Sequence, residues 1–263
     1  MALTFEDHPM HVLDGGPRIP FLLPRHETFL LLRREGIRRL QVLHFTRSFS
    51  RKSPEQFIQW LRSRFNIRAI VVGDNFRFGK DASGDVGLLK RMGLKYDFRV
   101  VDVKPVRLGK RVISSTQIRR LLSEGKTVLA NRMLGRAYAI GGEVVHGKHL
   151  GHQIGFPTAN LRAEQLLPKD GVYACGVRLG DRIYRAAMNL GKRPTFKEDD
   201  HRRLAEVHLL HYYGRLYGKR MTVHLLSYLR PEKKFSSSKE LVRQIRKDIH
   251  RTMKTPLKGV KAL

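Results

Sequence analysis

The chain has 263 residues, of which 41% are hydrophobic and 29% charged, a balance typical of globular proteins and unlike that of disordered ones. Its 52 lysines and arginines outnumber its 23 aspartates and glutamates, and the net charge of +29 predicts attraction to polyanions or to phosphorylated small molecules. A single cysteine excludes an intramolecular disulfide, and no apolar run is long enough for a membrane span or a signal peptide. Together these features predict a cytoplasmic protein.

The first half of the chain alternates strands with helices, which is the pattern of a parallel α/β sheet. Strands are expected at residues 3–5, 40–45, 69–72 and 98–103, and helices at 24–35, 53–65, 85–92 and from 113 toward 125. The clearest helix start is at Ser53, because Ser53 can cap the helix, Pro54 suits its first turn and Gln56 occupies the return position of a capping box.

After about residue 136 the pattern changes to strands without clear helices between them. They are expected near residues 138–145, 172–179, 183–189, 205–211 and 222–229, and Cys175 reads as a small core residue on one of them. Such a succession predicts an all-β unit in the form of a barrel. A closing helix, capped by Ser237, is expected to run to about His250, and the two domains are expected to meet near residues 130–137.

A glycine-rich stretch at residues 147–160 follows the strand expected at 138–145. Glycines let the backbone approach a ligand closely, and successive amides in such a loop can bind an anion, so a phosphate-binding loop is one hypothesis. The alternative is that glycine and proline only form a turn. The helix start at residues 113–120 leaves a similar choice, between a phosphate site beside Arg119 and a plain serine or threonine cap.

Six segments of the second half carry a more specific signal. They are Leu134-Gly135-Arg136, Val144-Val145-His146-Gly147, Gly155-Phe156-Pro157-Thr158-Ala159-Asn160, Gly171-Val172-Tyr173-Ala174, Asn189-Leu190-Gly191-Lys192-Arg193-Pro194-Thr195-Phe196 and Glu206-Val207-His208-Leu209. In this order they resemble the riboflavin kinase domain of the bacterial bifunctional riboflavin kinase/FMN adenylyltransferase (FAD synthetase) family. The resemblance implies that residues 131–263 form a riboflavin kinase barrel with a C-terminal helix.

Three segments of the first half resemble the adenylyltransferase domain of the same family. They are Thr4-Phe5-Glu6-Asp7-His8-Pro9, Gly73-Asp74-Asn75-Phe76-Arg77-Phe78-Gly79 and Ile113-Ser114-Ser115-Thr116-Gln117-Ile118-Arg119. The resemblance implies a Rossmann-like α/β nucleotidyltransferase domain at residues 1–130. The family's opening strand and its Gly-Asn-Phe-Asp-like segment with paired histidines are not found, since Met1 falls where the family's next strand begins. We therefore expect the FAD-forming half to be truncated or impaired.

The resemblance also implies a reaction and its residues. It implies ATP-dependent phosphorylation of riboflavin to FMN, with Mg²⁺ and phosphate held by Thr158 and Asn160, and with Glu206 as the base that accepts the proton of the 5′-hydroxyl. Without the resemblance, Glu206 would be read as an ordinary strand residue and Asn160 as a turn former. Further nucleotide-binding positions implied by the family are Gly151, Gly155, Pro157, Arg193, Asn75, Ser114, Ser115, Thr116 and Arg119.

Two positions depart from the family pattern. His152 stands where the family more often has arginine, which weakens the expected grip on phosphate, and Asn75 stands where many members have aspartate. Two alternatives stay open beside the kinase: a chain that retains full FAD synthetase activity, and a basic RNA-binding protein built on the same fold. Small-molecule substrates are the favoured partners, with no membrane and with nucleic acid not favoured.

Overall fold

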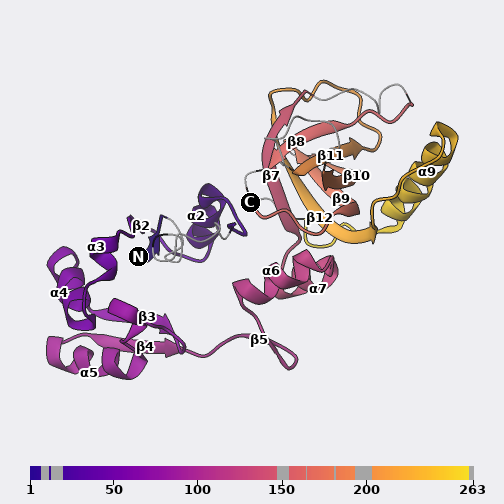
Figure 1. The fold of residues 1–263 in the computed structure, drawn as a ribbon. Coiled ribbons are helices and arrows are strands. Elements are labelled where there is room, and N and C mark those ends of the chain that lie inside the picture. The colour runs from indigo at the N-terminus through magenta and orange to yellow at the C-terminus, as the bar shows by residue number, and fades with distance from the viewer. Residues whose placement is uncertain are drawn as a thin grey trace. The chain divides into compact units, whose positions relative to one another are not determined.

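The computed structural model describes residues 1–6, 12, 20–146, 154–163, 165–180, 182–192 and 203–260 (Figure 1). The chain divides into two compact units, one of residues 1–19 and 32–112, and one of residues 20–31 and 113–263. Helix α2 (Arg25–Arg34) begins in the second unit and ends in the first. The boundary predicted near residue 130 separates the two domains of the family resemblance, not these two compact units, and it stays a prediction.

The first unit contains the predicted alternation of strands and helices. Its elements are β1 (Ala2–Phe5), β2 (Leu40–Leu43), α3 (Arg47–Ser50), α4 (Pro54–Arg64), β3 (Ala69–Gly73), η1 (Lys80–Ala82), α5 (Val86–Tyr96), β4 (Arg99–Val103), β5 (Arg107–Leu108) and β6 (Arg111–Val112). Strand β1 pairs with β2 and strand β3 pairs with β4, both in parallel, whereas β5 and β6 form a short antiparallel pair. The predicted parallel pairing is confirmed, but the paired strands form two separate two-stranded sheets, β1–β2 and β3–β4.

Local sequence determines where the helices of this unit begin. The Ser53 hydroxyl accepts a hydrogen bond from the Gln56 amide at 3.2 Å, and the Gln56 side chain accepts one from the Ser53 amide at 2.9 Å. This reciprocal pair confirms the predicted capping box at the start of α4. Helix α5 begins in a similar way, because the Asp85 carboxylate accepts from the Leu88 amide at 2.7 Å.

The core of the first unit lies between its helices and the β3–β4 sheet. Its buried residues are Ile58, Leu61, Phe78, Leu89, Met92 and Phe98. The outer side of the same sheet is different, since Val71 on β3 is 64% exposed and Val103 on β4 is 49% exposed. Parallel sheets are usually covered on both faces, so this small sheet is only half covered by the described residues.

The second unit is built around a closed barrel of six antiparallel strands. They are β7 (Tyr138–Val145), β8 (Ala159–Ala163), β9 (Gly171–Leu179), β10 (Arg182–Lys192), β11 (Arg203–Leu209) and β12 (Arg220–Arg230). They follow one another around the barrel in the order β10, β11, β8, β7, β12, β9. The predicted barrel and its five predicted strands are confirmed, and Cys175 is a fully buried residue of β9.

Strand β8 corrects one expectation. The stretch at residues 147–160 was expected to be a loop throughout, with Asn160 as a turn former on a plain reading of the sequence, but Ala159 and Asn160 already belong to β8. The reason is pairing on both sides, because Asn160 opposes Val145 of β7 and Glu206 of β11. Buried Leu161 then fixes which side of this short strand faces the barrel interior.

Besides the first part of α2, the second unit contains the helices α6 (Ser115–Ser123), α7 (Thr127–Leu134) and α9 (Ser238–Lys254). Helix α9 is the predicted closing helix; the Ser237 hydroxyl accepts from the Glu240 amide at 3.3 Å, and the helix ends one turn beyond the predicted His250. It packs against β9 and β10. None of the helices in the described residues is long and apolar enough to cross a membrane.

Candidate active site

One row of residues runs around the barrel from strand to strand. Strand register places Val145, Asn160, Glu206, Asn189, Val172 and Arg230 opposite one another in turn, on β7, β8, β11, β10, β9 and β12. Residues that oppose each other in a sheet project from the same face, so these side chains share one face of the barrel wall. The predicted base Glu206 and the predicted metal ligand Asn160 are therefore direct neighbours.

Burial shows which face this is. The residues on either side of the row, such as Leu161, Leu190 and Val207, are fully buried and fill the barrel interior. Because side chains alternate along a strand, Asn160, Glu206 and Asn189 belong to the outer face. Asn160 is nevertheless only 5% exposed, whereas Glu206 and Asn189 are half-buried. A polar row of this kind can bind a ligand from outside the barrel.

The segment that leads into β8 is held against this row by His208. The Nδ1 atom of His208 lies 2.8 Å from the carbonyl oxygen of Pro157, and because a carbonyl only accepts, the proton of this bond belongs to the imidazole. The Phe156 ring meets the His208 ring edge to face, with 5.6 Å between their centroids. His208 lies two residues after Glu206 on β11, so the contact brings Thr158 and Asn160 to the row that holds Glu206.

Gly155 marks the turn at the start of this segment. Its φ of +81° lies in the left-handed region, which favours glycine, and a Cβ at this position would meet no heavy atom within 4 Å. The backbone is therefore open on that side, as the predicted close approach of a nucleotide requires. The predicted residues Gly151 and Arg193, and the divergent His152, lie outside the described residues.

A second carboxylate reaches the row from the segment after β12. The Asn189 Nδ2 atom donates a hydrogen bond to Oε1 of Glu232 at 3.1 Å. The same segment is tied to the first turn of α9, where Glu240 accepts from the Lys233 ammonium at 2.9 Å and from the Ser236 hydroxyl at 2.9 Å. The hydrogen bond from Lys233, followed by those from Ser236, lowers the pKa of the Glu240 carboxyl to about 2.

The sequence alone does not indicate the contacts that Glu232 and His208 make. Both contacts join residues far apart in the chain, 43 positions for Asn189 and Glu232 and 51 for Pro157 and His208. No spacing rule connects such pairs before the strand register is known. Asn189 and His208 do fall within the segments that resemble the riboflavin kinase domain, and this is what marks them as candidate site residues in the sequence.

The predicted residues of the first half lie in two different units. Asn75 follows β3 in the first unit and is exposed. Ser114 caps α6 in the second unit, where its hydroxyl accepts from the Gln117 amide at 3.2 Å, and Arg119 donates to the Pro20 carbonyl at 3.2 Å. Ser115 and Thr116 are exposed in the first turn of α6. The cap at Ser114 is confirmed, and its proposed contact with phosphate stays a prediction.

Curated proteins resemble nearly the whole chain. It is 34% identical over 253 residues to the bifunctional riboflavin kinase/FMN adenylyltransferase of Buchnera aphidicola subsp. Schizaphis graminum, which covers 95% of this chain and 81% of that protein. Proteins of the same description from Escherichia coli K12 and Listeria monocytogenes are 36% and 33% identical, over 94% of this chain and 80% and 79% of theirs. The chain belongs to the bifunctional riboflavin kinase/FMN adenylyltransferase family.

Two domain models of this family divide the chain between them. The FAD synthetase model matches residues 1–117, and the riboflavin kinase model matches residues 134–255, which include the whole outer row of the barrel. A crystal structure described as a macrolide-efflux protein from Streptococcus pneumoniae is similar with a TM-score of 0.89 and 32% identity, over 97% of this chain and 83% of that one. The predicted family, the predicted order of nucleotidyltransferase domain and kinase barrel, and the predicted riboflavin kinase are confirmed.

Proposed function

We propose that this chain transfers the γ-phosphate of ATP to the 5′-hydroxyl of riboflavin, forming FMN, with Glu206 as the general base. The observation that carries the proposal is the direct opposition of Glu206 and Asn160 on neighbouring strands, within the part of the chain that matches riboflavin kinases. A kinase needs its phosphates held next to a group that accepts the hydroxyl proton. Asn160 would help to hold the phosphates and Glu206 would accept the proton, and the two residues lie on adjacent strands.

The residues at the start of β8 fit a magnesium ion. Magnesium prefers oxygen ligands and keeps part of its water shell, and Thr158 and Asn160 offer a hydroxyl and an amide oxygen beside the row. The described residues contain no cluster of three histidine, cysteine or acidic side chains, so this set is distinct from an all-carboxylate cage. When bound with ATP, the ion would neutralise charge on the phosphates.

The remaining residues of the site position the reactants. The His208 contact with Pro157 keeps Thr158 and Asn160 at the row, and Gly155 leaves the backbone open for the nucleotide. Gly151 and Arg193 are proposed as further nucleotide contacts, the arginine because a guanidinium can bind phosphate through two hydrogen bonds. Glu206 is half-buried, so it can reach a bound hydroxyl while water is partly excluded.

The test is production of FMN by the purified chain supplied with riboflavin, ATP and Mg²⁺. Replacing Glu206 by Gln keeps its size and removes its basicity, and kcat should fall by about 10²- to 10⁴-fold with little change in the melting temperature. Absence of FMN from the unaltered chain would refute the kinase. An unchanged kcat in Glu206→Gln would refute only the role of this residue.

The FMN adenylyltransferase half is proposed to be impaired. Its strands form two separate parallel pairs, β1 with β2 and β3 with β4, and Val71 and Val103 are 64% and 49% exposed. Nucleotide sites in such folds lie at the strand ends of a continuous sheet, so a divided sheet should hold Asn75 and its ligand less firmly. The same half would use Ser114, Ser115, Thr116 and Arg119 on α6 for phosphate.

This proposal is tested by supplying FMN, ATP and Mg²⁺ and measuring FAD. We expect FAD to form at least about tenfold more slowly than FMN forms from riboflavin under the same conditions, which is a difference of about 1.4 kcal/mol in activation free energy. Comparable rates would establish the alternative, a chain with full FAD synthetase activity.

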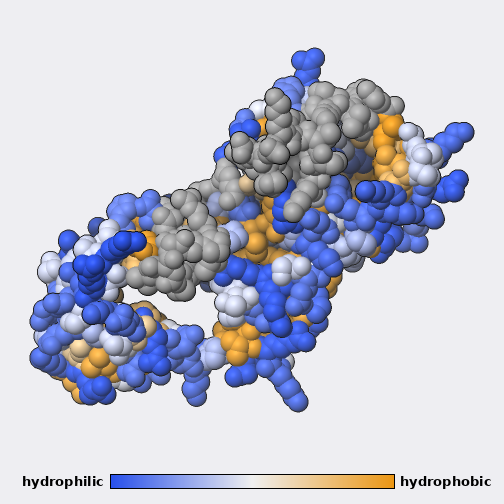
Figure 2. All heavy atoms as spheres, viewed as in Figure 1, coloured by the Kyte–Doolittle hydropathy of each residue, from blue (hydrophilic) through white to orange (hydrophobic). Residues whose placement is uncertain are grey.

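One observation favours the second candidate function, RNA binding. The outer face of α9 carries exposed basic side chains around a shallow hollow lined by Lys239, Val242, Arg243, Arg246, Lys247, His250 and Arg251. Figure 2 shows hydrophilic residues over most of the visible surface, in keeping with the net charge of +29. If this face binds single-stranded RNA, replacing its two lysines and the arginines at 243 and 246 by Gln should weaken binding. The slope of log K against log salt concentration should become less steep by roughly 0.7 per lost phosphate contact.

A matched control distinguishes this face from net charge alone. Replacing four exposed cations of the first unit by Gln, namely Arg68, Lys80, Lys104 and Lys110, removes the same charge elsewhere. Anisotropy of a labelled RNA, measured against salt concentration, should respond to the α9 variant and not to the control if α9 is a binding surface. Equal responses would mean that only the overall charge attracts RNA.

A further inference from the structure

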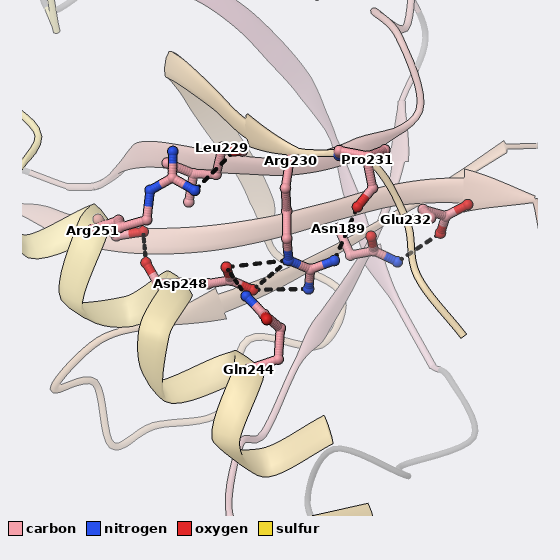
Figure 3. A network of polar contacts seen from close by, with 9 residues as sticks. Asn189, Leu229, Arg230, Pro231, Glu232, Gln244, Asp248 and Arg251 are labelled. Carbon is pink, nitrogen blue, oxygen red and sulfur yellow. Dashed lines mark hydrogen bonds and ion pairs between the residues drawn. The ribbon is translucent and has the colours of Figure 1, made fainter. Parts of the chain in front are cut away.

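We propose that Glu232 is a positioning residue of the kinase site, holding Asn189 in a fixed orientation beside Glu206. The inference rests on the proposed kinase function and extends it to the segment that follows β12. Asn189 opposes Glu206 in the strand register, and Glu232 contacts the Asn189 side chain (Figure 3). A residue outside the barrel strands thus determines how the outer row presents its amide next to the base.

The hydrogen bond fixes which end of the Asn189 amide faces Glu232. A carboxylate at neutral pH has acceptors and no donor, so the amide nitrogen, 3.1 Å from Glu232 Oε1, must lie toward it. The amide oxygen is then directed away from Glu232 and is presented as an acceptor. Without the carboxylate, the amide could turn over, and a donor would replace the acceptor beside Glu206.

Gly191 supports this placement independently of the hydrogen bond. A Cβ built on Gly191 would overlap the carboxylate of Glu232, so the carboxylate lies directly against the backbone of β10. Gly191 is two residues beyond Asn189 on the same strand and therefore on the same face. The glycine makes the space that the Glu232 carboxylate fills.

The backbone just before Glu232 is anchored to α9 (Figure 3). Arg230 pairs with Asp248, with Nε at 3.0 Å and Nη2 at 2.8 Å from Oδ2, and the Asp248 side chain is only 4% exposed. The same guanidinium donates from Nη1 to the carbonyl of Pro231 at 3.0 Å. Gln244 completes the arrangement by donating to Asp248 at 3.0 Å. Glu232 therefore extends from a segment whose start is fixed by a buried, bidentate ion pair.

This arrangement predicts an effect on the chemical step. A misplacement of about 1 Å near the reacting atoms can cost about 10²-fold in rate, and an amide turned the wrong way is an error of this kind. Substrate binding involves many other contacts. We therefore expect Glu232→Ala to lower kcat by about 10- to 100-fold, with the KM values for riboflavin and ATP changed by less than about twofold.

The experiment compares three variants of the full chain in the FMN assay. Glu232→Gln keeps an acceptor for Asn189 and should recover most of the kcat lost in Glu232→Ala. Glu124→Ala removes the same charge from an exposed glutamate that pairs with Lys126 away from the row, and kcat should stay at the level of the unaltered chain. A side-chain amide resonance of Asn189, followed by NMR of labelled protein, should shift in Glu232→Ala and not in Glu124→Ala.

The outcomes separate this inference from the function on which it rests. If the unaltered chain makes no FMN, the kinase proposal fails and the positioning role fails with it. If the unaltered chain makes FMN and Glu232→Ala does so with the same kcat, only the positioning role is refuted. If Glu232→Ala does not fold, Glu232→Asp decides: it keeps the charge but is too short to keep the contact, so its kcat should fall as well, and a kcat equal to that of the unaltered chain refutes the role.

Discussion

His224 is a buried histidine of β12 that is not part of the outer row of the barrel. It is 3% exposed, its Nδ1 atom has no hydrogen-bond partner among the described residues, and it opposes Ala139 and Gly176 in the barrel. Burial, with a smaller effect of the Arg178 charge, lowers the pKa of His224 to about 4. The imidazole is therefore neutral in the folded protein at pH values where the unfolded chain already binds a proton.

This difference predicts a loss of stability in acid. The unfolded chain protonates His224 near pH 6.5 and the folded chain near pH 4. The free energy of unfolding is therefore unaffected by His224 above pH 6.5 and falls as the pH drops from 6.5 to 4. The loss attributable to this residue should be about 3 kcal/mol. Urea unfolding at pH 7 and pH 4 measures it, and His224→Leu should show a smaller difference between the two pH values. An equal difference in both proteins would contradict the assignment.

The residues of the site differ in how far sequence could predict them. Glu206 and Asn160 were found through the family resemblance, because each lies in a segment with a recognisable pattern. Their direct opposition could not be predicted, since register between β8 and β11 depends on how the whole barrel closes. Glu232 carried no signal at all, because an exposed glutamate in a lysine-rich segment looks like any solvated surface residue.

At the level of elements, local signals were the reliable ones. The capping box of α4 was predictable because Ser53 and Gln56 are three residues apart and interact only with each other's backbone. Helix α7 was missed because Lys126 at its start makes no side-chain cap. Strand β8 was missed because its five residues follow a segment rich in glycine and proline, and its strand state depends on pairing with β7 and β11.

The pair of Arg230 and Asp248 should be the main attachment of α9 to the barrel. Side-chain exposure is 17% for Arg230 and 4% for Asp248, so removing one partner leaves a buried charge without compensation. Asp248→Ala should therefore lower the free energy of unfolding by about 3 to 5 kcal/mol, measured by urea unfolding at pH 7. The double variant Arg230→Met with Asp248→Leu should recover most of this loss. A single variant with unchanged stability would show that other contacts hold α9, among them the hydrogen bonds from Arg251 to the Leu229 carbonyl and from Arg185 to the Thr252 carbonyl.

At the scale of the whole molecule, the chain is two units that should respond separately to ligands. Trp60, the chain's single tryptophan, lies on α4 in the first unit, where it packs against Phe49 and Phe57. Seven of the eight tyrosines lie in the second unit and one, Tyr96, in the first. Tryptophan fluorescence therefore reports unfolding of the first unit, and near-ultraviolet tyrosine signals report mainly on the second.

The proposed kinase site lies wholly in the second unit, so its ligands should stabilise that unit in particular. Riboflavin with ATP and Mg²⁺ binds only the folded site, so it should raise the unfolding temperature seen by tyrosine signals, by an amount that grows with ligand concentration. At 100 times the dissociation constant the stabilisation should be about 2.7 kcal/mol. The tryptophan transition should move much less, because Trp60 belongs to the other unit. Equal shifts of both signals would mean that the two units unfold as one, and a shift of the tryptophan signal alone would place the ligand in the first unit.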